Sequence, residues 1–256
     1  MDKIKVLFMG RKPVAGNSLR WLLSKESVEV VGVVTDSHLP QSVCAGIANK
    51  SGVPLFSFEE ALAKTNSGEL VFDLGLSMLF WRKLKEGLIH SPKLKTINFH
   101  PAPLPEYKGT AGYNLAILDG LDEWSMTAHY VDEEIDTGEI IELQRFSICK
   151  DTETAQSLEK ISQEYLFKLF VNVVERVLET KGILPTTPNH GGRYISRADM
   201  ESMKEIKEGD DISRKIRAFW FPPYDGAYIT IGGNKFTLVD EYILNSLADS
   251  SVSRVF

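Results

Sequence analysis

Short apolar runs alternate with segments of helical periodicity along the first half of this 256-residue chain. The runs at 4–9 and 28–35 are almost unbroken, which is typical of strands buried on both faces. Between them, residues 18–23 continue into a helical pattern after a turn that contains Pro13 and Gly16. Strands that alternate with helices indicate right-handed crossovers and therefore a parallel sheet.

The same pattern predicts further strands at 70–75, 95–99 and 126–131, and helices at 42–50, 58–65 and 112–120. We therefore predict an α/β fold with an open, Rossmann-like sheet that is mostly parallel. A longer amphipathic pattern over 152–181, with apolar residues every three to four positions, predicts a helix that closes this sheet domain.

The last quarter of the chain reads differently. Residues 182–192 contain Pro185, Pro188 and two adjacent glycines, which predicts a connector. A helix is predicted at 211–220, and runs at 227–231 and 235–239 flank Gly232-Gly233-Asn234 as a β-hairpin. The expected domains are thus 1–181 and a small α+β extension at 182–256.

Composition narrows the class of protein. The chain is 43% apolar and 25% charged, as soluble globular proteins are. No run approaches the roughly 18 apolar residues of a membrane span, and the strand pattern begins at once, so we expect a cytoplasmic protein without a signal peptide or membrane partner. Cys44 and Cys149 lack metal-ligand spacing and fit a reducing compartment. A net charge of -6 argues against nucleic acid as the main partner.

Candidate chemistry lies at two strand ends. In an open α/β sheet, ligands bind beyond the carboxyl ends of the strands, where His100 is expected. The strand at 126–131 would deliver the acidic loop 132–138, with Asp136, beside it. Asn98 and His100 stand two apart and so share one face of their strand. Amide, imidazole and carboxylate groups can together stabilise an oxyanion, carry a proton and orient its carrier, as acyl transfer requires. The alternative, in which Asn98 and His100 only end a strand, is about equally open from these residues alone.

The segments NFHPAPLPEYKG at 98–109 and HYVDEEIDTGEII at 129–141 resemble the folate-dependent formyltransferases. This family includes glycinamide ribonucleotide transformylase, methionyl-tRNA formyltransferase and the nucleotide-sugar N-formyltransferases. The resemblance covers roughly 4–181. It implies that Asn98, His100 and Asp136 are catalytic, that N10-formyltetrahydrofolate is the co-substrate, and that no metal is needed.

The implied reaction is attack of an amine on the formyl carbon. Asn98 and His100 would stabilise the oxygen that becomes negative, and His100 would relay a proton near neutral pH. Asp136 would orient His100 and favour its charged form, or hold a water that shuttles the proton.

The resemblance also implies binding residues. Met78, Leu79 and Phe80 in LGLSMLFW would meet the pterin, and Asp132 and Ile135 would form the other wall of that pocket. His129, in the middle of a strand, is expected to be a packed histidine rather than a catalyst. The turn at 10–16 opens a helix that can receive a phosphate, with Arg11 or Lys12 beside it. The residues expected near the substrate amine are Tyr107, Lys108, Gly109 and Thr110.

The tail suggests which amine is formylated. Residues 216–219 and 222–228 are similar to the start of the C-terminal barrel of methionyl-tRNA formyltransferase and to the matching piece of sugar formyltransferases. The tail is short for that barrel and carries about as many acids as bases, which does not suit a tRNA reader. The combination most resembles a nucleotide-sugar N-formyltransferase that acts on an amino-deoxy sugar for bacterial surface polysaccharide, such as lipopolysaccharide O-antigen. The nucleotide, the sugar and the position of the amine are not identified by the sequence.

Three alternatives remain at this level. The chain can be a methionyl-tRNA formyltransferase-like enzyme, a formyltetrahydrofolate hydrolase in which water replaces the amine, or a binding protein without chemistry. The aromatic segment from Phe219 to Tyr224 has too much apolar surface to bury alone. It predicts a homodimer, with a tail folded back over its own chain as the nearly equal alternative.

Overall fold

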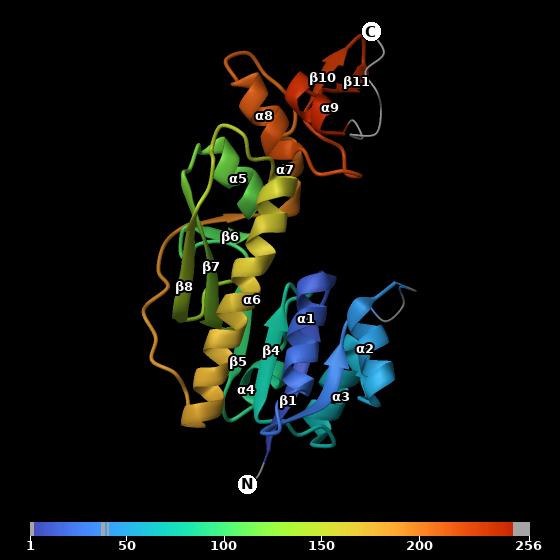
Figure 1. Ribbon diagram of the computed structural model, residues 1–256, viewed down its shortest axis with the longest axis vertical. Helices are drawn as coiled ribbons and strands as arrows, with labels where there is room; N and C mark the ends of the chain where they lie inside the picture. The colour runs from blue at the N-terminus through green and yellow to red at the C-terminus, as the bar shows by residue number, and fades with distance from the viewer. Residues whose placement is uncertain (1–2, 37–38, 40, 248–256) are drawn as a thin grey trace. The chain divides into compact units, whose positions relative to one another are not determined.

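A computed structural model describes residues 3–36, 39 and 41–247 of the chain (Figure 1). The elements follow in the order β1 (Ile4–Gly10), α1 (Lys12–Leu23), β2 (Val28–Val34), α2 (Val43–Ser51), β3 (Leu55–Phe56), α3 (Phe58–Ser67), β4 (Leu74–Met78), α4 (Glu86–His90), β5 (Thr96–His100), β6 (Tyr107–Gly109), α5 (Gly112–Leu118), β7 (Glu123–Tyr130), β8 (Ile140–Ser147), α6 (Ala155–Thr180), β9 (Arg193–Ile195), α7 (Arg197–Ser202), α8 (Ile212–Phe219), β10 (Tyr228–Ile231), β11 (Asn234–Thr237) and α9 (Glu241–Leu247).

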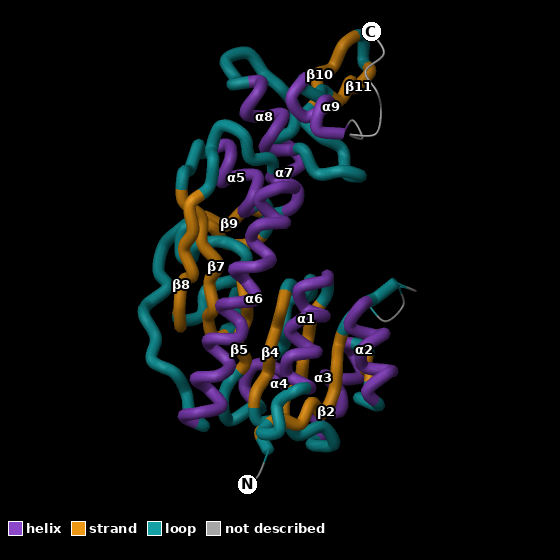
Figure 2. The backbone as a smooth tube through the Cα atoms, in the orientation of Figure 1, coloured by secondary structure: helices purple, strands orange, loops and turns teal. Residues whose placement is uncertain are grey.

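Seven strands form one sheet in the order β3-β2-β1-β4-β5-β7-β8 (Figure 2). The pairs β2/β3, β1/β2, β1/β4 and β4/β5 are parallel, whereas β5 and β7 are antiparallel. Strands β10 and β11 form a separate antiparallel hairpin. The predicted α/β class, its mostly parallel Rossmann-like sheet and the C-terminal hairpin are confirmed.

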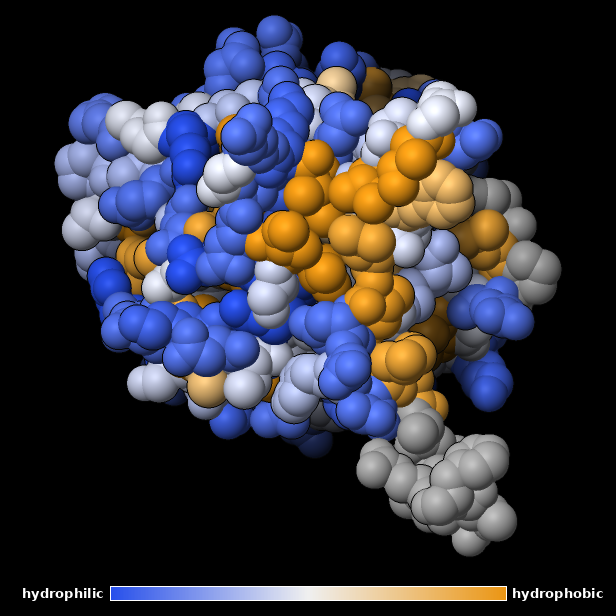
Figure 3. All heavy atoms as spheres, turned by 90° about the horizontal axis from the view of Figure 1, so that it is seen from above, coloured by the Kyte–Doolittle hydropathy of each residue, from blue (hydrophilic) through white to orange (hydrophobic). Residues whose placement is uncertain are grey.

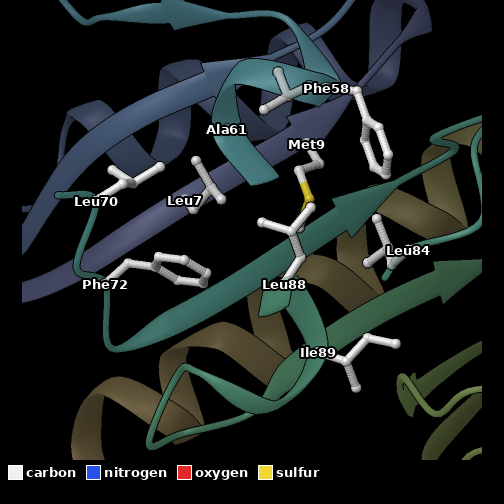
Figure 4. Packing of buried hydrophobic residues seen from close by; sticks show 10 residues of the cluster. Leu7, Met9, Phe58, Ala61, Leu70, Phe72, Leu84, Leu88 and Ile89 are labelled. Atoms are coloured by element: carbon white, nitrogen blue, oxygen red, sulfur yellow. The ribbon is translucent and has the colours of Figure 1, made fainter. Parts of the chain in front are cut away.

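Strand β1 is apolar apart from the exposed Lys5 near its start, because helices cover both faces of the sheet. Leu7 and Met9 belong to a buried cluster with residues of α3 and α4 (Figure 4). The alternate residue Phe8 meets Phe170 of α6 edge to face, with 6.4 Å between ring centroids. Successive residues of a strand point to opposite faces, so a strand between two helical layers has no polar side.

The predicted start of the first helix was wrong. Helix α1 begins at Lys12 rather than after a turn, with Pro13 in its first turn, where the missing N–H removes no helical hydrogen bond. Gly16 lies inside the helix, and a Cβ there would overlap the side chain of Val43 in α2. The two residues therefore mark a helix start and a close helix contact.

Two strand predictions also need correction. The strand predicted at 70–75 is β4 at Leu74–Met78; Leu70 and Phe72 are apolar because they pack in the cluster with α3 and α4, before the strand begins. Strand β8 was missed because its burial does not alternate regularly: along it, Ile140 and Phe146 are buried and the other residues are half-buried or exposed.

The chain forms two compact units. Unit 1 comprises 1–109, 124–146 and 161–194, and unit 2 comprises 110–123, 147–160 and 195–256. These units describe how compactly the chain packs, not which parts fold independently. The domain boundary predicted between residues 181 and 182 therefore stays a prediction.

Unit 2 has its own apolar cluster, which corrects the expectation for the aromatic segment. Phe219 is 2% exposed, and Trp220 and Phe221 pack against the same cluster with Ile117 of α5 and Ala155 of α6. The segment buries its rings because residues from earlier in the chain join it. Tyr224 alone among its aromatic residues is largely exposed.

The two cysteines are free and differ in environment. Cys44 is buried in α2, and burial raises the pKa of its thiol to about 11. Cys149 is exposed, and a hydrogen bond with the Thr152 side chain lowers the pKa of its thiol. No helix in the described part of the chain is both long and apolar enough to cross a membrane.

Candidate active site

The strand register places three segments at one edge of the sheet. Gly10 of β1 pairs with Met78 of β4, and Met78 pairs with Phe99 of β5. Because these strands are parallel, the residues that follow them lie at the carboxyl edge of the sheet. The strand order also reverses at β1, which is where ligands bind in such sheets.

Asn98 is held on both sides of its side-chain amide. The Ser77 hydroxyl of β4 donates to Asn98 Oδ1 at 2.8 Å, and Asn98 Nδ2 lies 3.0 Å from His129 Nε2. An amide nitrogen carries two hydrogens, so one remains to donate elsewhere. The fixed amide is suited to act as a donor to an oxyanion.

His100 is almost fully buried at the end of β5, where it is 5% exposed. Its Nε2 lies 2.8 Å from the carbonyl oxygen of Tyr107, which only accepts hydrogen bonds, so Nε2 carries a proton. Burial lowers the pKa of His100 below its ordinary value, helped by His129 and opposed by Asp136. The ring is therefore neutral near pH 7, with its lone pair on Nδ1.

Asp136 reaches His100 by a different route from the one predicted. Strand β7 runs antiparallel to β5, with Asn98 opposite His129, so β7 ends at the far edge of the sheet. The segment that follows turns back, and Asp136 adopts a left-handed conformation with φ of 57°. Its Oδ2 lies 3.4 Å from His100 Nδ1, and its Oδ1 lies 3.6 Å from His129 Nε2.

Asp136 is ionised in this position. Burial alone would raise its pKa, but His100, His129 and the N–H of Gly109, which donates to Oδ2 at 2.9 Å, hold the pKa well below its usual range. The structure thus places Asp136 against His100 and links Asn98 to Asp136 through His129. The shared strand face predicts only that Asn98 and His100 lie close together.

His129 is the member of this cluster whose part sequence reasoning did not recognise. It is 2% exposed and packed, as expected, but it also contacts both Asn98 and Asp136. Its Nδ1 lies 2.7 Å from the carbonyl oxygen of Tyr130. The pairing of His129 with Asn98 across the sheet would have revealed this role. That pairing cannot be predicted before β7 is known to run antiparallel to β5.

The residues predicted to meet the pterin lie at the end of β4. Met78 is fully buried, and its carbonyl accepts from the Arg11 N–H. Leu79, the residue after the strand, has a φ of 51°. Phe80 stacks on Phe58, with 6.0 Å between centroids.

The predicted second wall lies close to this segment. Val131 and Phe80 pack against the same apolar cluster, and Lys83 pairs with Glu134 at 3.3 Å. Asp132 is exposed and accepts from the Glu134 N–H, and Ile135 is 39% exposed. The exposed apolar side chain of Ile135 beside the end of β4 fits a flat apolar ring.

The predicted substrate residues divide into three groups. Arg11 lies 3.5 Å from Asp36, and Lys12 is exposed at the start of α1. Tyr107 and Gly109 supply backbone groups to His100 and Asp136. Lys108 and Thr110 bond instead to the carbonyl oxygens of Gly191 and Ile195, respectively.

Within the described residues, no three His, Cys, Asp or Glu side chains are grouped as metal ligands. Transfer without a metal therefore stays a prediction that rests on the resemblance.

Comparisons with known proteins show which family the chain resembles. The sequence model of the formyl transferase family matches residues 2–174. Methionyl-tRNA formyltransferase of a Sulfurihydrogenibium species is 28% identical over 236 residues, 84% of this chain and 73% of that protein. The enzyme of the same name from Listeria monocytogenes is 27% identical over 91% of this chain and 78% of its own.

Solved structures are similar over nearly the whole chain. An N-formyltransferase from Helicobacter canadensis, in complex with folinic acid and dTDP-3-aminofucose, has a TM-score of 0.74 and 27% identity over 91% of this chain and 86% of its own. A 4-N formyltransferase from Francisella tularensis has a TM-score of 0.78 at 23% identity, covering 93% of this chain and 97% of its own, which shows the shared fold.

Proposed function

Because the chain belongs to the formyl transferase family, we propose that it transfers the formyl group of N10-formyltetrahydrofolate to the amine of a nucleotide-linked amino-deoxy sugar. The observation that carries the chemistry is the contact of Asp136 with His100 and with His129, which in turn binds Asn98. In this reaction a bond forms between the amine nitrogen and the formyl carbon, and the bond between the formyl carbon and N10 breaks. The amine loses one proton, and N10 gains one.

Asn98 stabilises the oxygen of the tetrahedral intermediate. Ser77 and His129 fix its amide, and the remaining N–H is oriented before the reaction begins. Such preorganised donors are worth about 10²- to 10³-fold in turnover.

His100 takes the proton at Nδ1. Its Nε2 hydrogen is committed to the Tyr107 carbonyl, so His100 is better placed to accept a proton than to bind the oxyanion. The Asp136 carboxylate, 3.4 Å from Nδ1, stabilises the charged ring that results. The proton then passes to the leaving nitrogen.

The formyl donor fits the end of β4. Phe80 and Ile135 offer apolar surface beside the end of β4, where a pterin ring can lie. The Helicobacter canadensis relative, at 27% identity, was solved with folinic acid, which supports a folate here.

The same relative was solved with dTDP-3-aminofucose, which supports an amino sugar linked to a nucleotide. We expect Arg11 and Lys12, at the start of α1, to bind the phosphates of this substrate. Residues 107–110, which follow His100 closely in sequence, are expected to lie near its amine. The proposal extends to a cytoplasmic homodimer that serves surface polysaccharide synthesis, and the free thiols fit a reducing compartment.

A panel assay tests this function. The protein is mixed with N10-formyltetrahydrofolate and with dTDP-, UDP- or GDP-linked amino sugars, and the products are analysed by mass spectrometry. We expect one amino sugar to gain a formyl group and its N-acetylated counterpart to remain unchanged. Consumption of the formyl donor without any amine would instead indicate a hydrolase.

The second candidate is formylation of methionyl-tRNA, because the curated relatives at 27–28% identity bear that name. The net charge of -6 disfavours it. Initiator methionyl-tRNA belongs in the same assay, with a salt series for binding. Formyl-methionine on the tRNA, together with salt-dependent binding, would replace the amino-sugar proposal.

A further inference from the structure

The connector predicted at 182–192 contains a buried side chain that faces the site. Asn189 is 5% exposed, and its Nδ2 donates to the carbonyl oxygens of Asp136 at 3.0 Å and of Gly138 at 2.8 Å. Its Oδ1 is buried without a hydrogen-bond partner. A reversed amide would place that oxygen against two other carbonyl oxygens, so the contact requires the two N–H groups.

The backbone around Asn189 is fixed on both sides. Thr187 exchanges two backbone hydrogen bonds with Ile140, at 2.9 and 2.8 Å. Beyond it, Lys108 Nζ donates to the Gly191 carbonyl at 2.7 Å, and the Arg193 N–H donates to Glu106 at 3.1 Å. We call residues 187–193 the strap.

The strap touches both backbone segments that orient the reacting groups. Through Asn189 it holds the loop in which Asp136 adopts its left-handed conformation. Through Lys108 and Glu106 it holds β6, whose Tyr107 carbonyl orients His100 and whose Gly109 N–H binds Asp136. All of these residues belong to unit 1.

Asp136 depends on such support. A left-handed conformation costs free energy for a residue with a Cβ, and persists where neighbouring groups fix it. The Asn189 amide binds the carbonyl of Asp136 itself, so it acts on the direction of the carboxylate rather than on its charge.

We propose that Asn189 is a positioning residue for formyl transfer: it binds the Asp136 and Gly138 carbonyls and thereby keeps the Asp136 carboxylate against His100 Nδ1. This role rests on the proposed function. It assigns catalytic importance to a segment that composition alone marks as a linker.

The principal test compares Asn189→Ala with His190→Ala, a matched control at the neighbouring, exposed position of the strap. Displacement of a reacting group by about 1 Å costs on the order of 100-fold, so we expect Asn189→Ala to lower kcat by about 10- to 100-fold. KM should change little, and His190→Ala should match the wild type. A folded Asn189→Ala variant with kcat within about twofold of wild type would overturn the proposal.

A double-mutant cycle separates positioning from general loosening. If Asn189 acts through Asp136, then Asn189→Ala added to Asp136→Asn lowers kcat no further. Losses that multiply fully would show that Asn189 acts elsewhere. Should Asn189→Ala fail to fold, Asn189→Ser, which retains one donor, is judged by the same two criteria, with thermal melting as the check of folding.

A readout without substrate keeps this inference distinct from the proposed function. The His100 ring is titrated by NMR on histidine-labelled protein and assigned with His100→Asn. Asp136 raises the pKa of His100 and His129 lowers it, so release of Asp136 in Asn189→Ala should move the midpoint to lower pH. An unchanged midpoint would refute positioning whatever the substrate is. A shifted midpoint in a protein that formylates no amine would refute only the function.

Discussion

His100 and Asp136 occupy one buried site in opposite forms, a neutral ring beside a carboxylate. Burial lowers the pKa of the ring, because a charged imidazole loses hydration there. The electrostatic interaction with His100 and hydrogen bonds with His129 and the Gly109 N–H hold the pKa of the carboxyl below its usual range. As the pH falls, each group therefore takes up a proton at a lower pH in the folded protein than in the unfolded chain.

This arrangement makes stability depend on pH. The pKa of His100 is lowered in the fold, so the unfolded chain binds a proton that the folded protein does not. The free energy of unfolding should fall as the pH drops below about 6.5, and again below about 3.8, where unfolded Asp136 is protonated. Urea unfolding at about pH 7 and about pH 5.5 measures the first step, which should be smaller in His100→Asn. An equal decrease in the free energy of unfolding between these pH values in the two proteins would mean that His100 is not held neutral.

Substitution of the three groups tests their joint role. Asn98→Ala, His100→Asn and Asp136→Asn should each lower turnover by roughly 100-fold or more while the melting transition persists. Near-normal turnover in any of them would remove that residue from the mechanism. The exposed Glu133→Ala is the control for the Asp136 loop.

The sequence predicts these three residues but not their contacts. Asn98 and His100 share a face because strand geometry requires it. The contacts of the Tyr107 carbonyl and the Gly109 N–H could not be predicted, because every residue has these backbone groups and the residue type does not reveal them. Asn189 escapes because proline and glycine around it indicate only a turn.

At the level of elements, the reversal of β7 decides how Asp136 is delivered. A parallel β7 would have ended beside His100, as predicted; the antiparallel strand ends opposite, and the following segment returns. An apolar strand pattern gives no direction, so sequence alone could not distinguish the two. The helices were easier to predict, because their apolar period is distinctive and serines cap α2 and α3.

Two adjacent glycines in the strap give a matched test of its fit. Both have positive φ, 80° at Gly191 and 73° at Gly192. A Cβ at 191 would meet open space, whereas one at 192 would overlap the Pro105 carbonyl. Gly191→Ala should cost about 1 kcal/mol of stability from backbone strain, and Gly192→Ala about 2 kcal/mol more, with a drop in activity. Equal melting temperatures in these variants would contradict the packing of the strap on Pro105.

For the whole molecule, exposed apolar residues of unit 2 bear on the predicted homodimer. Figure 3 shows apolar residues at the molecular surface. On β10, β11 and α9 and between them, the exposed ones are Ile231, Phe236, Val239, Tyr242, Leu244 and Leu247. Trp220, in the aromatic segment, packs on the cluster of unit 2, so its substitution would disturb folding.

We therefore expect the dimer to depend on the hairpin. Sedimentation at micromolar concentration should give twice the chain mass of 28.7 kDa, and Phe236→Glu should shift the protein toward monomer. Val71→Glu, at a 63% exposed position of unit 1, is the control and should remain dimeric. A wild-type particle near the chain mass would refute the dimer.

The different environments of the two cysteines make each a separate chemical reporter. A maleimide reacts with the thiolate, so at neutral pH it should label exposed Cys149 in unit 2 quickly and spare Cys44, buried in unit 1. Native protein should take up one label and denatured protein two. The slow labelling rate of Cys44 would then measure how often unit 1 opens in the wild-type protein.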